Sequence, residues 1–353
     1  MRLKKEVKYV FLEKDLKQLG IEVIGKVEDE KIIKIAEQVA IKLTKEFPEN
    51  KKSYLEIYHI LLTTPMYYAN ISNKISEANY FYKNSAIYFS NQANLDEINE
   101  YIFHECIHRL QEHRDKKGNL TRMGLCEINE LSVKGTALNE AAIQYIVSKS
   151  LQIPKDLVTI YNITLNTRTR YYPLITNLIS QIAFLLGEQK LVDSTINSNE
   201  EFKIEIIDNL GESEYTRIVK NFDGILNTKN EILELQQNGD DFSEKEQVIQ
   251  DMYIETQNLI FTSFFENLLK RIDTLEEISN FRKKIYSYRS MIGTTIGYDF
   301  FNSYCTDLDK RAKEKADKIK ENASLALIND NKFWRFFRKL KKLFTNSTNE
   351  YDK

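Results

Sequence analysis

Two histidines near position 100 have the spacing of a metal site. His104 and His108 enclose Glu105 in the segment HECIH, which has the pattern H-E-x-x-H. On a helix, residues four apart lie on one face, so both imidazoles can bind one metal ion. Glu105 then lies about 100° around the helix, where its carboxylate can reach a water on that ion without binding the ion itself. The expected chemistry is hydrolysis by an activated water, although an ordinary helix can also carry this pattern by chance.

A third ligand has to come from elsewhere in the chain, and three downstream glutamates are candidates: Glu127, Glu130 and Glu140. Spacing alone favours Glu127, but the segment around it contains Gly124 and has no room for a helix before Gly135. Glu140 instead lies in the apolar segment GTALNEAAIQYI, which predicts a helix beside the histidines. Burying an unpaired carboxylate there is costly, and a bound cation removes that cost. We therefore expect Glu140 as the third ligand, with Glu127 and then Glu130 as alternatives.

The segment QANLDEINEYIFHECIHRLQEHRDKKGN must position the two histidines. It predicts one helix, with Asn94 or Asp96 as its N-cap and Gly118 as its end. Cys106 lies about 200° from His104 on this helix, so we exclude the thiol as a ligand. The expected core face comprises Leu95, Ile98, Ile102, Cys106 and Leu110.

The sequence predicts an α+β protein that is mostly helical. Only 11 glycines and 4 prolines interrupt its 353 residues, and most long segments have helical periodicity. The expected strands are 7–13, 65–72 and a run at 78–90, which predict a small mixed sheet near the N-terminus. The expected helices include 29–47, 53–62, 136–151 and 172–187, the last beginning at Pro173 and ending at Gly187.

Three parts are expected along the chain. Residues 1–200 form a catalytic domain, with a sheet part at 1–94 and a helical part at 95–200, and a soft boundary lies around 190–212. Residues 201–330 form a helical domain. A basic amphipathic tail follows at 331–353.

Composition narrows the classes of function. Lys and Arg number 50 against 52 Asp and Glu, so the net charge near −2 offers no field that would attract nucleic acid. No apolar run has the length of a membrane span or a signal peptide. Three widely spaced cysteines, Cys106, Cys126 and Cys305, suit a reducing compartment better than a disulfide framework. We therefore expect a cytoplasmic protein that does not bind nucleic acid.

HECIH followed by LNEAA resembles the gluzincin class of zinc metallopeptidases, in which two helices carry an H-E-x-x-H and an N-E-x-x motif. The resemblance covers about residues 78–190. It implies a zincin-like domain in which His104, His108 and Glu140 bind Zn²⁺ and Glu105 is the general base. Thermolysin-like members orient a ligand histidine with an aspartate where this chain has Gln144, so the side-chain carbonyl of Gln144 or Asn139 is the expected acceptor.

Peptide hydrolysis also needs a donor for the developing oxyanion. No histidine follows His113, so tyrosines are the candidates, Tyr172 first, Tyr171 second and Tyr145 third. The strand at 84–90 is expected to bind an extended peptide substrate by edge pairing. The alternative function is a non-catalytic binding or regulatory protein on the same scaffold.

The segment KFWRFFRKLKKLF at 332–344 separates apolar and basic residues by helical face. Three interpretations stay open: a terminal helix docked on its own domain, attachment to a membrane surface, and binding of a partner protein. Oligomeric state is not encoded in any of these patterns. The apolar face has Phe333, Phe336, Phe337, Leu340, Leu343 and Phe344; the basic face has Lys332, Arg335, Arg338, Lys339, Lys341 and Lys342.

Overall fold

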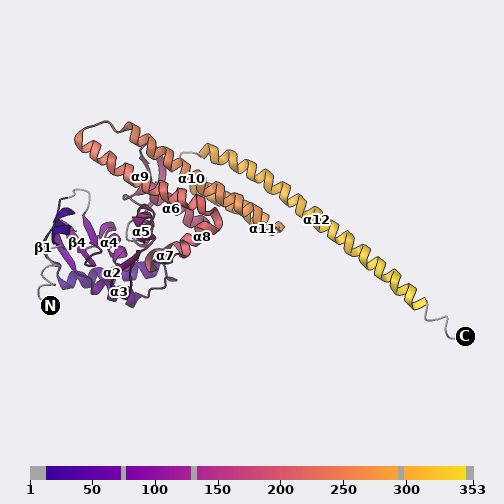
Figure 1. The fold of residues 1–353 in the computed structure, drawn as a ribbon, viewed down its shortest axis with the longest axis horizontal. Helices are drawn as coiled ribbons and strands as arrows, with labels where there is room; N and C mark the ends of the chain where they lie inside the picture. The colour runs from indigo at the N-terminus through magenta and orange to yellow at the C-terminus, as the bar shows by residue number, and fades with distance from the viewer. Residues whose placement is uncertain (1–12, 73–76, 129–132, 293–297, 347–353) are drawn as a thin grey trace. The chain divides into compact units, whose positions relative to one another are not determined.

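The computed structural model describes residues 13–72, 77–128, 133–292 and 298–346. They form a mostly helical α+β fold with small sheets, as predicted from the sequence (Figure 1). The chain divides into two compact units. The first runs to Phe264 and includes Ile292, and the second comprises Phe265–Met291 and the chain from Tyr298 onward. The boundary expected at 190–212 lies inside the first unit.

A mixed four-stranded sheet forms the N-terminal part of the first unit, in the order β1-β2-β4-β3. β2 and β4 are parallel, and the two other pairs are antiparallel. The strand at 84–90, which was expected to bind a peptide at the sheet edge, is β4. β4 lies in the interior of the sheet, so the choice of this strand was wrong. β3 lies at the edge instead. The strand expected at 7–13 lies outside the described residues, except for Glu13, which is helical. The bounds are β1 Ile21–Lys26, β2 Met66–Ile71, β3 Ala78–Phe81 and β4 Ala86–Ser90.

Three helices share a core with this sheet: α2 (Asp29–Glu46), α3 (Tyr54–Leu62) and α4 (Glu100–Leu110). α2 and α3 occupy the predicted ranges, and α3 begins with a capping box in which Ser53 and Glu56 bond each other's backbone N–H. α4 buries five apolar side chains, and each full burial of this kind contributes about 1.5–3 kcal/mol. The histidine helix is thereby fixed against the sheet. The five buried side chains of α4 are Ile102, Phe103, Cys106, Ile107 and Leu110.

The rest of the first unit is built around α5, which packs against α4, α6 and α9. α5 and α6 have the predicted positions, and Pro173 begins α6 while Gly187 ends it. A second four-stranded sheet, β5 to β8, connects α4 to α5, and a β9–β10 hairpin connects α5 to α6. The helices are α5 Thr136–Ser150, α6 Pro173–Leu186, α7 Glu188–Asn197, α8 Glu201–Leu210 and α9 Glu212–Asn238. The strands are β5 Glu112–Arg114, β6 Leu120–Met123, β7 Cys126–Ile128, β8 Val133–Lys134, β9 Asp156–Ile160 and β10 Ile163–Thr167.

The second unit contains the end of α10 (Ser243–Arg271), most of α11 (Leu275–Ile292) and α12 (Tyr298–Asn346). Its core is aromatic, with Phe265, Phe281, Tyr288 and Phe301 in edge-to-face contacts. Residues 331–346 of the expected tail form the end of α12, and Phe333, Trp334 and Phe336 there are each more than half exposed. In the described part of the chain, no helix has both the length and the hydropathy to cross a membrane.

Candidate metal centre

α4 carries both histidines but is shorter than the sequence predicts. Asn99 is its N-cap, because the Asn99 side chain accepts a hydrogen bond from the backbone N–H of Ile102 at 3.1 Å. The expected caps Asn94 and Asp96 precede the helix. Gly118 does not end it, since α4 stops at Leu110 and the chain enters β5. The histidine spacing falls within the helical part, so the error in the ends leaves the site intact.

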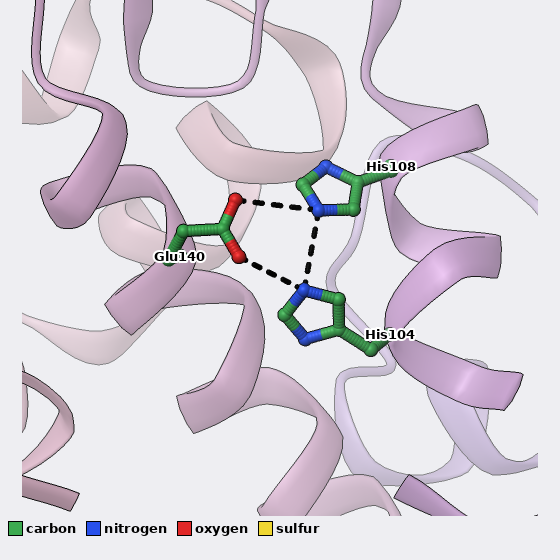
Figure 2. Close-up of side chains that lie close together, drawn as sticks. All are labelled: His104, His108 and Glu140. Carbon is green, nitrogen blue, oxygen red and sulfur yellow. Dashed lines mark hydrogen bonds and ion pairs between the residues drawn. The ribbon is translucent and has the colours of Figure 1, made fainter. Parts of the chain in front are cut away.

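His104, His108 and Glu140 converge on one point (Figure 2). The two Nε2 atoms lie 3.2 Å apart. Of the two Glu140 carboxylate oxygens, which come from α5, Oε2 lies 3.0 Å from Nε2 of His104 and Oε1 lies 3.4 Å from Nε2 of His108. Both histidines are buried at 8% exposure, and the Glu140 side chain is 14% exposed. Three donor atoms from two helices therefore face a common centre with little access to bulk water.

These separations fit one bound ion. A tetrahedral metal ion with ligand distances of about 2.0–2.2 Å holds its donor atoms about 3.3–3.6 Å apart. The nearest pairs of donor atoms here are 3.0 to 3.4 Å apart, and one ligand atom from each residue lies within 4.8 Å of the other two. Two imidazole nitrogens and a carboxylate oxygen are also a donor set that divalent metal ions accept. The group can therefore hold a metal ion, with a further coordination position left for a small molecule.

The alternative ligands are placed elsewhere. Glu127 lies on β7 and forms an ion pair with Lys203, so the spacing argument in its favour was wrong. Glu130 lies outside the described residues. Cys106 is fully buried on the core face of α4, and burial raises the pKa of its thiol, which agrees with its exclusion as a ligand. Glu140 is the glutamate that the fold brings to the histidines.

A chain of hydrogen bonds orients His104. Nε2 of Gln144 donates to the Glu100 carboxylate at 2.7 Å, which leaves the Gln144 carbonyl oxygen facing Nδ1 of His104 at 3.1 Å. Nδ1 must then carry a proton and donate it, so Nε2 is the nitrogen that can bind a metal. Gln144 is therefore the acceptor, as expected, and the other candidate Asn139 bonds elsewhere.

His108 is oriented differently. Its ring stacks on Tyr80 with the ring centroids 6.2 Å apart and the planes at 9°. Nδ1 of His108 is buried, and in the described part of the chain it has no hydrogen-bond partner. Packing against an aromatic ring therefore helps to fix this imidazole, while its Nε2 faces His104 and Glu140.

The charges of His104 and Glu140 strongly shift each other's pKa values. Burial by itself would lower the pKa of His104, but the hydrogen bond and charge of Glu140 outweigh burial and raise this pKa to about 9. Burial by itself would raise the pKa of Glu140, but the neighbouring His108 and His104 outweigh it and hold this pKa well below its usual range. Without metal, a proton on His104 therefore occupies the centre near neutral pH.

Metal affinity is expected to fall as pH falls, because the metal must displace the proton from His104. With its pKa at about 9, affinity should weaken about tenfold for each pH unit below that value. Competition with a chelator of known protonation constants measures this. His113→Ala is the control, because His113 is exposed on β5 and should leave the slope unchanged. Affinity that stays constant from neutral pH upward would contradict the account.

Two contacts of α5 set the position of Glu140. Asp223 on α9 accepts hydrogen bonds from the backbone N–H groups of Gly135 and Ala137, at 3.4 and 2.9 Å, at the start of α5. It takes the place of an N-cap side chain, which Gly135 lacks. Gln111 and Asn139 bond each other through their amides at 3.0 and 3.3 Å, which ties the end of α4 to α5. The helices that carry the metal ligands, α4 and α5, are thus held by contacts at two places near the metal group.

Gly124 makes that second contact possible. Its φ is +58°, and a Cβ there would lie 2.1 Å from Oδ1 of Asn139 and 2.3 Å from Nε2 of Gln111. The chain entering β7 therefore passes close behind the amide pair, and a side chain at this position would be strained and would displace that pair. The backbone N–H of Leu125 also donates to Asn139 at 3.0 Å.

A cavity of about 310 Å³ opens beside the metal group, and His104 and Glu105 are part of its wall. The backbone N–H of Tyr80, on the edge strand β3, donates to one carboxylate oxygen of Glu105 at 2.6 Å. Glu105 is therefore held in the cavity by the edge of the sheet. The complete wall comprises Glu77, Ala78, Asn79, Glu100, Tyr101, His104, Glu105, Gln144, Tyr171, Tyr172, Lys229, Asn230 and Leu233.

Of the three tyrosine candidates, Tyr172 and Tyr171 line this cavity and Tyr145 does not. The Tyr145 hydroxyl donates instead to Glu188 at 2.6 Å. The Tyr172 ring centroid lies 6.4 Å from that of His104. Burial raises the pKa of the Tyr172 phenol well above its usual value, and the charges of Glu140 and Glu105 add to this effect. Tyr172 therefore keeps its proton and can donate a hydrogen bond.

Tyr172 also has an unusual backbone. Its φ of 52° and ψ of 42° are in the left-handed region, which costs a residue with a side chain on the order of 1 kcal/mol or more. This conformation ends the loop after β10 and begins α6 at Pro173. It also directs the Tyr172 ring into the cavity wall beside His104.

Sequence reasoning missed Tyr80, Asp223 and Lys229. They reach the site from β3 and α9, and nothing in their local sequence distinguishes them from ordinary surface or core residues.

No protein-family model matches this chain, and comparison with curated proteins and with solved structures also gave no match.

Proposed function

We propose that the protein is a zinc-dependent metallopeptidase. The observation that carries the proposal is the convergence of His104, His108 and Glu140 beside a cavity whose wall includes His104 and Glu105. Two imidazoles and a carboxylate are the ligands of many catalytic zinc sites. The order of motifs along the chain supports a gluzincin-type, zincin-like domain.

The ligand residues have distinct tasks. His104, with its tautomer fixed by Gln144, and His108 would hold the ion through Nε2, and Glu140 would supply the oxygen ligand. Zinc, when bound, polarises a substrate carbonyl and lowers the pKa of water toward about 7. The anionic ligand comes from α5 and both neutral ligands come from α4, so packing between these helices sets the shape of the site.

Glu105 would transfer a proton from the attacking water. One of its oxygens accepts from the backbone N–H of Tyr80, and this bond fixes the direction of the carboxylate. The other oxygen is available to take a proton from the attacking water and later to deliver it to the leaving amine. Glu105 is therefore the proposed general base and general acid.

Tyr172 is the proposed donor to the oxyanion. It retains its proton, lies beside His104 and lines the cavity. A neutral donor placed where negative charge develops stabilises the transition state more than the ground state. Tyr171 lines the same cavity but is 39% exposed, so it is the second candidate.

An extended peptide is proposed to lie along β3. This strand is at the edge of the sheet, and Glu77, Ala78 and Asn79 at its start line the cavity. Peptides add to such edges through main-chain hydrogen bonds. The edge strand would thus bring a peptide bond next to Glu105.

Hydrolysis of a peptide mixture, followed by mass spectrometry, tests the function. Zinc-loaded protein should cleave peptides, chelation should stop cleavage, and added zinc should restore it. Zinc binding without cleavage of any peptide would favour the alternative, a non-catalytic binding or regulatory protein.

We also propose that the protein acts in the cytoplasm, with a peripheral contact at the membrane surface through residues 332–344. The three cysteines are free and buried, as suits a reducing compartment. On α12, exposed aromatic rings and exposed basic residues occur in the same segment, which is typical of an interfacial helix. The exposed basic residues are Lys332, Arg335, Arg338 and Lys339.

Deletion of residues 332–353 is expected to abolish binding to anionic liposomes and to leave zinc content unchanged. Each basic residue near such a surface contributes about 1 kcal/mol, so binding by the intact protein should also weaken with salt. Co-sedimentation measures both effects, with neutral liposomes as the control. If intact protein does not sediment and the deletion lowers the melting temperature, the segment is a docked helix.

A further inference from the structure

Lys229 on α9 is a cation with no acidic partner inside the proposed active-site cavity. It is the sole lysine or arginine in the described wall of that cavity. Within the described residues, its one electrostatic contact is a cation–π contact with Tyr172, whose ring centroid lies 4.6 Å from Nζ. The side chain is half-buried, and burial lowers its pKa.

Two other partly buried lysines of this unit have polar partners. Lys149 contacts the carboxylates of Glu188 and Glu46. Lys52, whose pKa burial also lowers, donates to the carbonyl of Ile196 at 2.8 Å and to Asn197 at 2.9 Å. An ammonium group without such partners costs free energy to bury, and an anionic ligand would offset that cost.

Distances place this cation close to the proposed reaction centre. The Tyr172 ring is near both Lys229 and His104, with centroid distances of 4.6 Å to Nζ and 6.4 Å to the imidazole. Nζ is therefore at most the sum of these, 11.0 Å, from the His104 ring. An extended peptide spans about 3.3–3.6 Å per residue, so this reach corresponds to no more than about three residues.

We propose that Lys229 binds a carboxylate of the substrate within about three residues of the scissile bond. The inference rests on the proposed peptidase function and names its substrate class. Two peptide groups supply this chemistry, the free C-terminal carboxylate and the side chain of Asp or Glu. The first would make the protein a carboxypeptidase that releases one to three residues, and the second would make it selective for acidic sequences.

Binding is tested without turnover, in the Glu105→Gln variant loaded with zinc. Matched pools of random N-acetylated peptides are made with a free C-terminus or as C-terminal amides, and amidated pools are made with one fixed Glu or Gln. Retention on the immobilised variant is measured by mass spectrometry. Lys229→Met is added to the variant, with Lys220→Met as the matched control, because Lys220 is exposed on the same helix and absent from the cavity wall.

Carboxylate-bearing peptides are expected to bind about 10- to 100-fold tighter than their neutral partners, as for a hydrogen bond between charged groups. Lys229→Met should remove the difference, whereas Lys220→Met and Lys229→Arg should keep it. Preference for the free C-terminus identifies the first source, and preference for Glu over Gln identifies the second. Equal binding of all pools, or a preference that survives in a folded Lys229→Met protein, overturns the proposal. Hydrolysis by the parent protein is scored separately, so a failed peptidase is distinguished from a failed carboxylate site.

Discussion

Replacing Glu105 by glutamine is expected to lower kcat for peptide hydrolysis by about 100- to 10,000-fold, the usual contribution of general acid–base catalysis. Glutamine has the same shape and can still accept the hydrogen bond from the Tyr80 backbone, so the fold should be kept. It cannot take a proton from water. Glu105 does not belong to the ligand group, so metal content should not change.

The measurement pairs single-turnover hydrolysis with elemental analysis of the same preparation. Glu97→Gln is the matched control, since Glu97 is exposed just before α4 and should behave like the parent protein. Equal turnover by the Glu105→Gln protein would remove Glu105 from the mechanism. A loss of metal together with activity would show that Glu105 acts on the ligands and not on the water.

Replacing Glu140 by glutamine is expected to weaken metal binding by more than about 100-fold, beyond the 10- to 100-fold effect typical of groups that only support ligands. A neutral amide is a poor ligand, and the change also removes the negative charge that faces both histidines. Fold should persist, because Asp223 and the Gln111–Asn139 pair still hold α5.

Glu127→Gln is the control for that result. Glu127 pairs with Lys203 away from the centre, so its loss should leave the affinity for metal unchanged. Isothermal titration with zinc compares the two variants. If Glu127→Gln abolishes binding while Glu140→Gln retains it, the ligand assignment is wrong.

Features encoded over short distances could be predicted from the sequence. Periodic apolar residues placed α2, α5 and α6, and four-residue spacing placed His104 and His108 on one face. The choice of Glu140 over Glu127 depended on burial, because a glutamate flanked by apolar residues on a buried helix needs a partner. Its partners were the two histidines.

Features that depend on tertiary packing could not be predicted. Asn99 caps α4 in place of Asn94 or Asp96, since several residues in that segment can cap and the sheet decides where the helix begins. The edge position of β3 depends on strand order, which local pattern does not encode. Asp223 and Lys229 reach the site through the packing of α9, and a polar residue on a long helix carries no local sign of such a role.

Elemental analysis of protein prepared without a metal-binding tag, after zinc supplementation and dialysis, tests the central claim most directly. The account predicts about one zinc per chain in the parent protein and almost none in the His104→Ala variant. A substoichiometric zinc content that His104→Ala leaves unchanged would contradict it.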